Sequence, residues 1–399
     1  MITKQPQAPV YRGNLYSPAT IADPYPVYAQ LRSLGPVVWL ARHRAFALTR
    51  YEECKKTLLD DGTFVSGHGV GLNPIANRFS RGTTLNSDGE EHAARRKLVA
   101  HRLTPRALKS MSETIEAAAE QVATDAAARG QVDGVQIAHS LPLQVVPDLV
   151  GWPEGEREHL LTWAAATFDV LGPLNSTSAR SAAASVGMLR FARRIARTGN
   201  VLPGSMGDEV IAAARAGSIP AGEASALMID YLAPSLDTTI SAISSALRLL
   251  ALHPEQWDEI RADRDLIPNA FNEVVRYEAP LRAFSRRVAS DTTIAGTAIP
   301  RGARVVVLYA SANRDEDFWD EPETFDIHRD AGRHLGFGHG THGCAGQGLA
   351  RLEGQALLNA LADRVERIEL AGEPTWGCNN IIRGLSSLPL TLHPIGATA

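Results

Sequence analysis

The sequence lacks the features that mark several large classes of protein. Its 399 residues contain only three cysteines, at 54, 344 and 378, too few for a disulfide framework in a chain of this length. At least one thiol must be unpaired, which favours a reducing compartment. The first residues, MITKQPQAPVYRGNLYSP, lack the apolar core of a secretory signal. With no apolar run of about 18 residues either, the sequence predicts a cytoplasmic protein with no membrane partner.

An excess of charge of one sign is also missing. Lys and Arg number 40 and Asp and Glu number 44, so the net charge is −4, which is too balanced for general affinity to nucleic acid. The 44% hydrophobic content argues against disorder and allows a large buried core. No internal repeat and no Gly/Ser-rich or charged linker divides the chain.

Helical periodicity fills most of the sequence. Apolar residues recur at i, i+3 and i+4, and Pro or Gly often stands near an end of the pattern. These patterns predict helices over 26–34, 105–129, 156–171, 179–198, 221–252, 254–261, 269–278 and 346–368.

Strand signals are fewer and shorter. They predict one hairpin from 37–40 and 45–49, another from 293–294 and 303–308, and a last short strand at 389–392. There is no regular alternation of strands and helices, which argues against a doubly wound fold. The predicted fold class is mainly α, with small sheets (α+β).

The segment FGHGTHGCAG at 337–346 is the most informative stretch. Its glycines spell G-x-G-x-x-G, but no apolar strand precedes them, as a dinucleotide-binding turn requires. His342 and Cys344 could serve zinc, but no C-x-x-C pair exists to complete four ligands. The third interpretation is a loop that presents a thiolate to haem iron.

The haem-thiolate interpretation gives these residues a physical purpose. Glycines let the backbone pass close to a flat macrocycle and adopt unusual φ values. The helix expected from about residue 346 would point N–H groups and its positive dipole end at the sulfur of Cys344, which favours the thiolate. Phe337 would cover the ligand side and limit water.

Residues 337–346 match the haem-binding signature of the cytochrome P450 family, F-G-x-G-x-H-x-C-x-G, at every fixed position. The sequel LARLE at 349–353 also resembles the soluble bacterial members. The resemblance implies the P450 fold, with a long central helix over the haem and small β-sheets, as a single domain spanning 1–399. It assigns Cys344 as the ligand of the iron of haem b.

An E-x-x-R motif, Glu273 to Arg276, stands about 70 residues before the cysteine. Alone, such a motif is usually a surface ion pair at i,i+3 spacing, worth ~0.5 kcal/mol. In the family this position holds a structural Glu–Arg pair that anchors the segment leading into the haem loop. The resemblance suggests Arg329 as its third member.

The predicted helix 221–252 is apolar nearly all round, so it should cross the core. Asp237 and Thr238 lie in its middle, where polar residues are unfavourable without a purpose. A back-bonded Thr and a partnered Asp would explain them. The resemblance instead implies an acid–alcohol pair that delivers protons during dioxygen activation. Pro234 and Ser235 replace the family's usual small residue and Gly, and Pro234 predicts a kink.

Cationic side chains at four positions are the candidates for binding the haem propionates. His92 and Arg96 match the family's H-x-x-x-R helix, and their i,i+4 spacing puts both on one face. Arg286, with Arg287 close enough in register to compete, and His342 complete the set that the resemblance implies. Each one alone would be an ordinary surface residue.

The resemblance places the substrate pocket on separated, largely apolar segments, which favours a small neutral or aromatic substrate. Segments 233–240 and 279–286 look similar to bacterial members that O-demethylate methoxy-aromatics such as guaiacol or syringol. The candidate pocket residues, which would otherwise be plain core, are Val70, Phe168, Leu232, Leu281, Ala283 and Leu385.

The expected activity is that of a haem-thiolate monooxygenase that uses O2 and acts as a monomer. No room remains for a flavin or iron–sulfur domain, so electrons from NAD(P)H should arrive through a separate ferredoxin or flavin reductase. The basic stretch of Arg95, Lys97, Arg102 and Arg106 could steer an acidic partner or be a plain solvated face. Rival hypotheses are another apolar substrate such as a terpene, a peroxide-driven enzyme, and a haem-binding sensor without turnover.

Overall fold

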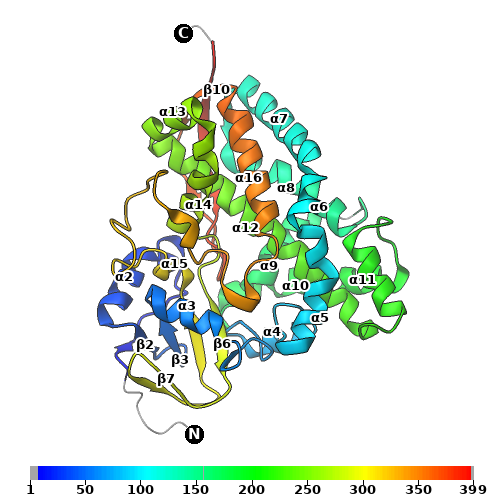
Figure 1. Ribbon diagram of the computed structural model, residues 1–399, viewed down its shortest axis with the longest axis vertical. Helices are drawn as coiled ribbons and strands as arrows, with labels where there is room; N and C mark the ends of the chain where they lie inside the picture. Colours follow the sequence, from blue (N-terminus) through cyan, green and yellow to red (C-terminus); the bar gives the residue numbers. More distant parts are fainter. Residues whose placement is uncertain (1–7, 156, 397–399) are drawn as a thin grey trace.

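The structure, a computed structural model, describes residues 8–155 and 157–396. Helices dominate it and gather around one long central helix, α12 (Figure 1). The helices are α1 (Pro18–Ala22), α2 (Tyr25–Leu34), α3 (Tyr51–Leu59), α4 (Pro74–Phe79), α5 (Gly89–Ala100), α6 (Pro105–Lys109), α7 (Ser112–Arg129), α8 (Gly134–Val150), α9 (Leu160–Asp169), α10 (Ser176–Thr198), α11 (Met206–Arg215), α12 (Ala224–Leu252), α13 (Pro254–Ala262), α14 (Ile267–Tyr277), α15 (Tyr309–Ala312) and α16 (Gln347–Ala362).

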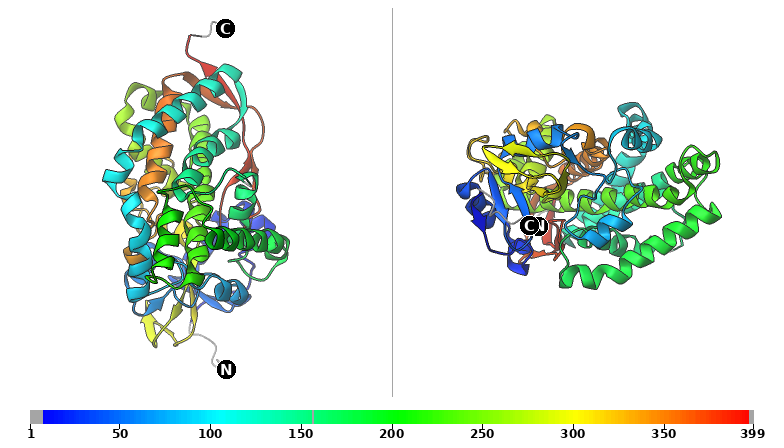
Figure 2. Two further views of the ribbon diagram at one scale, coloured as in Figure 1. Left: turned by 90° about the vertical axis from the view of Figure 1, so that its right-hand side faces the viewer. Right: turned by 90° about the horizontal axis from the view of Figure 1, so that it is seen from below.

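The strands form small sheets at the edge of the helical body. The largest has the order β1-β2-β3-β9-β6-β4, and smaller ones pair β10-β13-β5, β11-β12 and β7-β8. Figure 2 shows the N-terminal strands beside the strands of residues 284–307. The strands are β1 (Val10–Tyr11), β2 (Val37–Leu40), β3 (Ala45–Leu48), β4 (Phe64–Val65), β5 (Gln131–Asp133), β6 (Phe284–Val288), β7 (Thr292–Ile294), β8 (Thr297–Ile299), β9 (Arg304–Val307), β10 (Val365–Leu370), β11 (Thr375–Trp376), β12 (Leu385–Ser387) and β13 (Pro389–Pro394).

Helix α12 organises the main hydrophobic core because its sequence is apolar on nearly every side. Leu232, Ala233 and Leu236 are fully buried. The helix packs against α8, α9 and α10, and also against α14 and α16. It therefore lies between the α9–α10 pair and the helix that follows the cysteine loop.

The mainly α fold class is confirmed, but the bounds of three predicted helices were wrong. The helix predicted over 105–129 is broken between α6 and α7, where Ser110 and Met111 leave helical hydrogen bonding. The helix predicted over 346–368 ends at Ala362, because Val365–Leu370 pairs as β10 with β13. The helix predicted over 156–171 begins at a residue outside the described ones, and α9 starts at Leu160.

The second predicted hairpin pairs differently from the prediction. β7 pairs with β8 instead of with 303–308. The valine-rich β9 lies between β3 and β6, in register with Phe46 on one side and Phe284 on the other. A run buried from both sides gains more apolar burial there than in a two-stranded edge hairpin.

The predicted single domain of 1–399 includes residues 1–7, 156 and 397–399, which lie outside the described part, and it stays a prediction. Across 8–155 and 157–396, no helix has the length and apolar character needed to traverse a bilayer.

Candidate active site

The loop before α16 folds back on itself through its own backbone. Cys344 N donates to the carbonyl of Phe337 at 2.8 Å, and Gly343 N donates to Gly340 O at 2.9 Å. Gly338 and Gly340 both have φ of +67°, a conformation that side chains other than glycine rarely adopt. A Cβ on Gly340 would lie 2.5 Å from the carbonyl oxygen of Leu58 on α3. These contacts fix where the thiol of Cys344 points.

Cys344 is half-buried directly before the N-terminus of α16. Burial raises the pKa of its thiol, while the N–H groups of Gly346 and Gln347 and the guanidinium groups of Arg96 and Arg351 act to lower it. The sequence predicts only the lowering effects on this pKa, whereas in the protein chain itself burial outweighs them. The positive charge of a bound metal ion is what would fix this sulfur as a thiolate.

His92 and Arg96 on α5 meet the cysteine loop. Arg96 donates to the carbonyls of Gly343 at 2.7 Å and Thr341 at 3.3 Å, which ties α5 to the loop. The rings of His92 and His342 have centroids 4.3 Å apart. Burial and the nearby His342 and Arg96 lower the pKa of His92 to about 4, so the imidazole is neutral at physiological pH. The structure thus brings these three residues together.

Arg286 and Arg287 on β6 point to opposite sides. Arg286 is buried and Arg287 is exposed, as the alternation along a strand requires. Arg286 donates to the carbonyl of Ser285 at 3.1 Å. Within residues 8–155 and 157–396 it forms no salt bridge with a carboxylate. Of the two, Arg286 is therefore the buried cation, and no carboxylate of the described residues neutralises its charge.

These features fit a haem group. The Nε2 atoms of His92 and His342 are buried without a hydrogen-bond partner among the described residues, and buried polar atoms normally have one. Together with the buried guanidinium of Arg286 they could bind two propionate carboxylates, with His342 Nε2 also lying 3.9 Å from Asp88 Oδ1. The glycine loop and the thiol of Cys344 supply the close approach and the soft ligand that haem iron takes.

Asp237 and Thr238 lie on α12, which runs without a break through Pro234. The Thr238 hydroxyl donates to the carbonyl of Pro234 at 2.6 Å, as expected for a back-bonded threonine. The Asp237 carboxyl, by contrast, makes no hydrogen bond or ion pair within the described ranges. Burial, and secondarily the negative charge of Asp169, raise the pKa of Asp237 to about 7.

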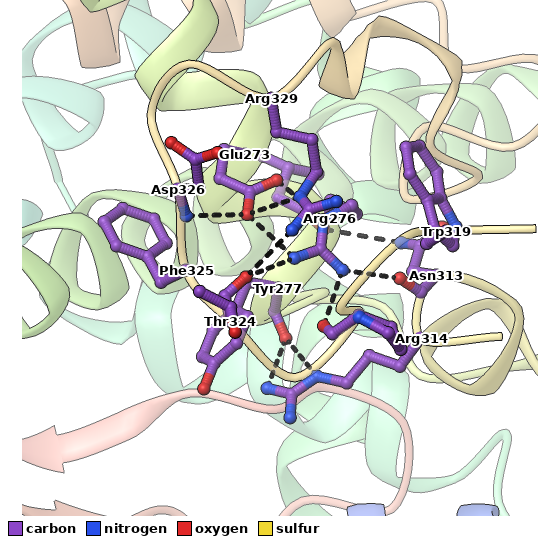
Figure 3. Close-up of polar contacts among 12 residues, drawn as sticks. Glu273, Arg276, Tyr277, Asn313, Arg314, Trp319, Thr324, Phe325, Asp326 and Arg329 are labelled. Carbon is purple, nitrogen blue, oxygen red and sulfur yellow. Dashed lines mark hydrogen bonds and ion pairs between the residues drawn. The ribbon is translucent and has the colours of Figure 1, made fainter. Parts of the chain in front are cut away.

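The E-x-x-R pair lies at the centre of a buried network (Figure 3). Arg276 donates from Nε and Nη2 to the two oxygens of Glu273, at 2.6 and 2.7 Å, and both side chains are 0% exposed. Arg329 Nε donates to Glu273 Oε1 at 3.3 Å, and Asp326 N donates to the same oxygen at 3.1 Å. The structure thus joins Glu273, Arg276 and Arg329, and fixes the segment that leads into the cysteine loop.

The candidate pocket residues fall into two groups. Val70, Phe168 and Leu281 share one hydrophobic cluster, and Ala283 lines the same narrow gap as Val70. Leu232 and Leu385 instead belong to the main core around α12. Their packing there is ordinary core packing, so the structure does not bring all six predicted residues together.

A cavity of about 320 Å³ opens on the Phe337 side of the cysteine loop. Its rim carries the cations Lys55, Arg333 and Arg351, and Arg351 lies over the Phe337 ring at 4.5 Å. Phe337 lines this cavity beside the loop, and its role in covering the thiol stays a prediction.

Only part of the predicted basic stretch, which runs from Arg95 on α5 to Arg106 on α6, is free and exposed to solvent. Arg95 is buried and donates to Glu223 at 2.8 and 3.0 Å, so its assignment to an exposed basic face was wrong. Arg102 pairs with Glu209. Lys97 and Arg106 are exposed. The ion pairs with distant Glu residues neutralise half of the predicted stretch.

Sequence reasoning missed Asn313, which joins the buried network to the cysteine loop. Its backbone carbonyl accepts from Arg276 Nη1 at 2.9 Å, and its side-chain oxygen accepts from Leu335 N at 2.7 Å. Asn313 is fully buried, between the apolar and small residues 305–312 and the charged residues 314–317. An amide at this boundary was the only available signal.

A family profile, curated relatives and solved structures all relate this chain to the same family. The profile described as Cytochrome P450 matches residues 208–365. The chain is 37% identical to cytochrome P450 CYP199A2 of Rhodopseudomonas palustris, over 94% of this chain and 92% of that protein. It is 30% identical to 6-deoxyerythronolide B hydroxylase of Saccharopolyspora erythraea, over 95% and 98% respectively. The solved structure of cytochrome P450 CREJ in complex with (4-ethylphenyl) dihydrogen phosphate superposes with a TM-score of 0.86 at 27% identity, covering 95% of this chain and 99% of that one.

The fold, with a cysteine loop that fits haem, defines a haem-containing protein of the oxygenase class. The chain belongs to the cytochrome P450 family. It is accordingly a monooxygenase that uses haem b, O2 and electrons from NAD(P)H delivered by redox partners.

Proposed function

We propose that Cys344 ligates the haem iron and that His92, Arg96, Arg286 and His342 bind the propionates. The observation that supports this most is the pair of buried imidazole nitrogens, His92 Nε2 and His342 Nε2, which have no hydrogen-bond partner among the described residues. When bound, haem b activates dioxygen so that one oxygen atom enters the substrate. The chain's residues position the group, and Phe337 limits access of water to the thiol.

In the same proposal, Asp237 and Thr238 on α12 supply and hold the protons that dioxygen activation consumes. A carboxyl with a pKa of about 7 is partly protonated at neutral pH, which suits a group that both gives and regains a proton. The Thr238 hydrogen points at the Pro234 carbonyl, so the hydroxyl oxygen remains able to accept a hydrogen bond.

The proposed substrate is a small methoxy-aromatic such as guaiacol or syringol. Val70, Phe168, Leu281 and Ala283 give an apolar wall with no charge, and segments 233–240 and 279–286 resemble those of aromatic O-demethylases. The aromatic ligand named for the CREJ structure supports this choice. The product would be a phenol plus formaldehyde. A larger apolar skeleton is the second candidate, favoured by the hydroxylase of 6-deoxyerythronolide B.

We further propose that the chain works as one domain and a monomer in the cytoplasm, where free thiols persist, and takes electrons from a separate ferredoxin or flavin reductase. The cations Lys55, Arg333 and Arg351 near the cysteine loop, with exposed Lys97 and Arg106, suit an acidic electron carrier. All three cysteines are free.

The substrate proposal is tested by titrating purified holoenzyme with guaiacol, syringol and their ethoxy analogues. We expect a substrate-induced spin-state shift and, with NAD(P)H and a surrogate ferredoxin and reductase, one formaldehyde per guaiacol consumed. Ethoxy analogues should yield acetaldehyde instead. Spin shifts with terpenes or macrolides alone, and no formaldehyde from any methoxy-aromatic, would reject the aromatic assignment while leaving the monooxygenase activity intact.

Replacing Thr238 with alanine should waste reducing equivalents. We expect the haem spectrum and substrate binding to persist, while the share of NAD(P)H electrons recovered as hydrogen peroxide rises several-fold, because proton delivery loses its ordered hydroxyl. Thr198→Ala is the matched control, since Thr198 makes the same type of bond to the residue four before it, on α10. Unchanged coupling in Thr238→Ala would remove Thr238 from the mechanism.

A further inference from the structure

The segment 68–72, which precedes α4, has its backbone polar groups held by side chains from distant elements. Val70 N donates to Asn86 Oδ1 at 3.0 Å, and Val70 O accepts from both N and Oγ of Ser285, each at 2.8 Å. A loop without regular structure thus becomes part of the edge of β6.

Close packing fixes the glycines of this segment. The Asn77 side chain accepts from Gly71 N at 3.0 Å and donates to Gly71 O at 2.9 Å. Gly69 has φ of +89°, and a Cβ there would lie 2.2 Å from the Asn77 side chain. Leu72 N donates to Leu171 O at 2.8 Å, which joins the segment to the connection between α9 and α10.

Arg304 on β9 closes the arrangement. Its Nη1 donates to Gly69 O at 2.7 Å, Gly71 O at 3.0 Å and Ser285 Oγ at 2.9 Å, and its Nη2 donates to His68 O at 3.2 Å. Within the described ranges, no carboxylate forms a salt bridge with it. Burial and the neighbouring Arg287 lower the pKa of Arg304 to about 10, so it remains charged at neutral pH.

The chemistry of the side chain explains why an arginine stands here. A guanidinium group presents five N–H donors in a rigid plane and can serve several carbonyls at once, whereas a lysine ammonium concentrates three donors at one atom. The contacts made by Arg304 all go to the segment 68–71 and to Ser285, and none goes to the cysteine loop or α12.

The segment that Arg304 holds borders the candidate substrate pocket. Val70, Leu171, Ala283 and Ile381 line one gap, and Val70 is almost fully buried there. A displacement of 68–72 would therefore move the Val70 wall and, through Leu72, the connection between α9 and α10.

We infer that Arg304 is a positioning residue that determines substrate selectivity by clamping the segment 68–72 in place. This inference rests on the proposed function only in taking Val70 as part of the substrate pocket. The clamp sets the shape of the pocket wall without touching the groups proposed for haem or proton delivery.

The test compares Arg304→Met and Arg304→Lys with Arg287→Met in the full-length holoenzyme. Arg287 is the matched control because it pairs with Arg304 across the two strands yet is exposed. The readouts are amide hydrogen exchange at Val70, Gly71 and Leu72, spin-shift dissociation constants for guaiacol and for a bulkier methoxy-aromatic, and the carbon monoxide band.

In Arg304→Met we expect exchange at these amides to accelerate about tenfold or more, since several hydrogen bonds that restrain the segment are lost. The affinity ratio between guaiacol and the bulkier substrate should fall about tenfold, because a loosened wall admits the larger ring. The carbon monoxide band should stay that of the wild type. Arg304→Lys should lie in between, and Arg287→Met should match the wild type.

Wild-type exchange and a wild-type affinity ratio in Arg304→Met would overturn the inference, as would loss of its carbon monoxide band, which would place Arg304 with the haem residues. If Arg304→Met does not fold, the same readouts on Arg304→Lys decide. A wild-type protein without a thiolate-type band would refute the proposed function instead, and the amide exchange would still decide whether the clamp exists.

Discussion

Replacing Cys344 with serine is expected to abolish the red-shifted carbon monoxide band of thiolate-ligated haem and to lower turnover by about 10³-fold or more, ~4 kcal/mol of transition-state stabilisation. A serine hydroxyl keeps its proton at neutral pH and offers a hard oxygen instead of a soft, electron-donating sulfur. The reduced, carbon monoxide-treated difference spectrum and NAD(P)H-driven product formation measure the two effects.

Cys378→Ser is the control for this experiment, because Cys378 is an exposed free thiol. It should keep the wild-type band and rate. A thiolate-type band in Cys344→Ser, or its loss in Cys378→Ser, would contradict the assignment of Cys344 as the ligand. A band typical of histidine-ligated haem in the wild type would contradict it as well.

Replacing Glu273 with glutamine should destabilise the protein by about 3–5 kcal/mol, the usual cost of removing one partner of a buried ion pair. Arg276 would then remain a fully buried cation without its carboxylate, and Arg329 and the Asp326 amide would lose their charged acceptor. Denaturant unfolding, monitored by far-UV circular dichroism, gives the free energy of unfolding at equilibrium.

Asp258→Asn on α13 supplies a matched comparison, because Asp258 and Arg261 form an exposed pair with the same i,i+3 spacing, at 3.5 Å. Exposed pairs of this kind contribute roughly 0–1 kcal/mol. Equal, small losses in the two variants would show that burial of the Glu273 pair has no special weight. Haem content should also fall in Glu273→Gln, since the pair holds the segment that leads to the cysteine loop.

The sequence predicted the helices well where periodicity is unbroken, as in α12 and α10. It missed α8, because Pro142 and Pro147 interrupt the pattern, although the helix contains both. Val365–Leu370 was assigned to a helix because its apolar residues also fit helical spacing, whereas its pairing partner β13 lies more than twenty residues on. Such pairings depend on contacts that no local window contains.

The features of the site also divide into those that local sequence predicts and those that depend on long-range contacts. The turn of the Cys344 loop depends on bonds within ten residues, so it could be anticipated from the motif, whereas the contacts of the loop with Arg96 and Leu58 could not. The ion pair of Arg95 with Glu223, and the bonds from Arg304 to residues 68–71, join positions more than 120 residues apart. A single sequence shows both arginines only as charges, and tertiary packing decides which of them reach solvent.

The middle of α12 differs mechanically from its two ends. The hydroxyls of Ser235, Thr238 and Ser241 each donate to a carbonyl four residues earlier, and Pro234 has no N–H to offer Asp230. A backbone carbonyl that also accepts a hydrogen bond from a side chain forms a weaker hydrogen bond with the N–H four residues later in the helix. Helix α12 should therefore bend more easily over residues 234–241, which include Asp237 and Thr238, than elsewhere. A bulky substrate can be accommodated by bending there, without displacing the C-terminal half of the helix.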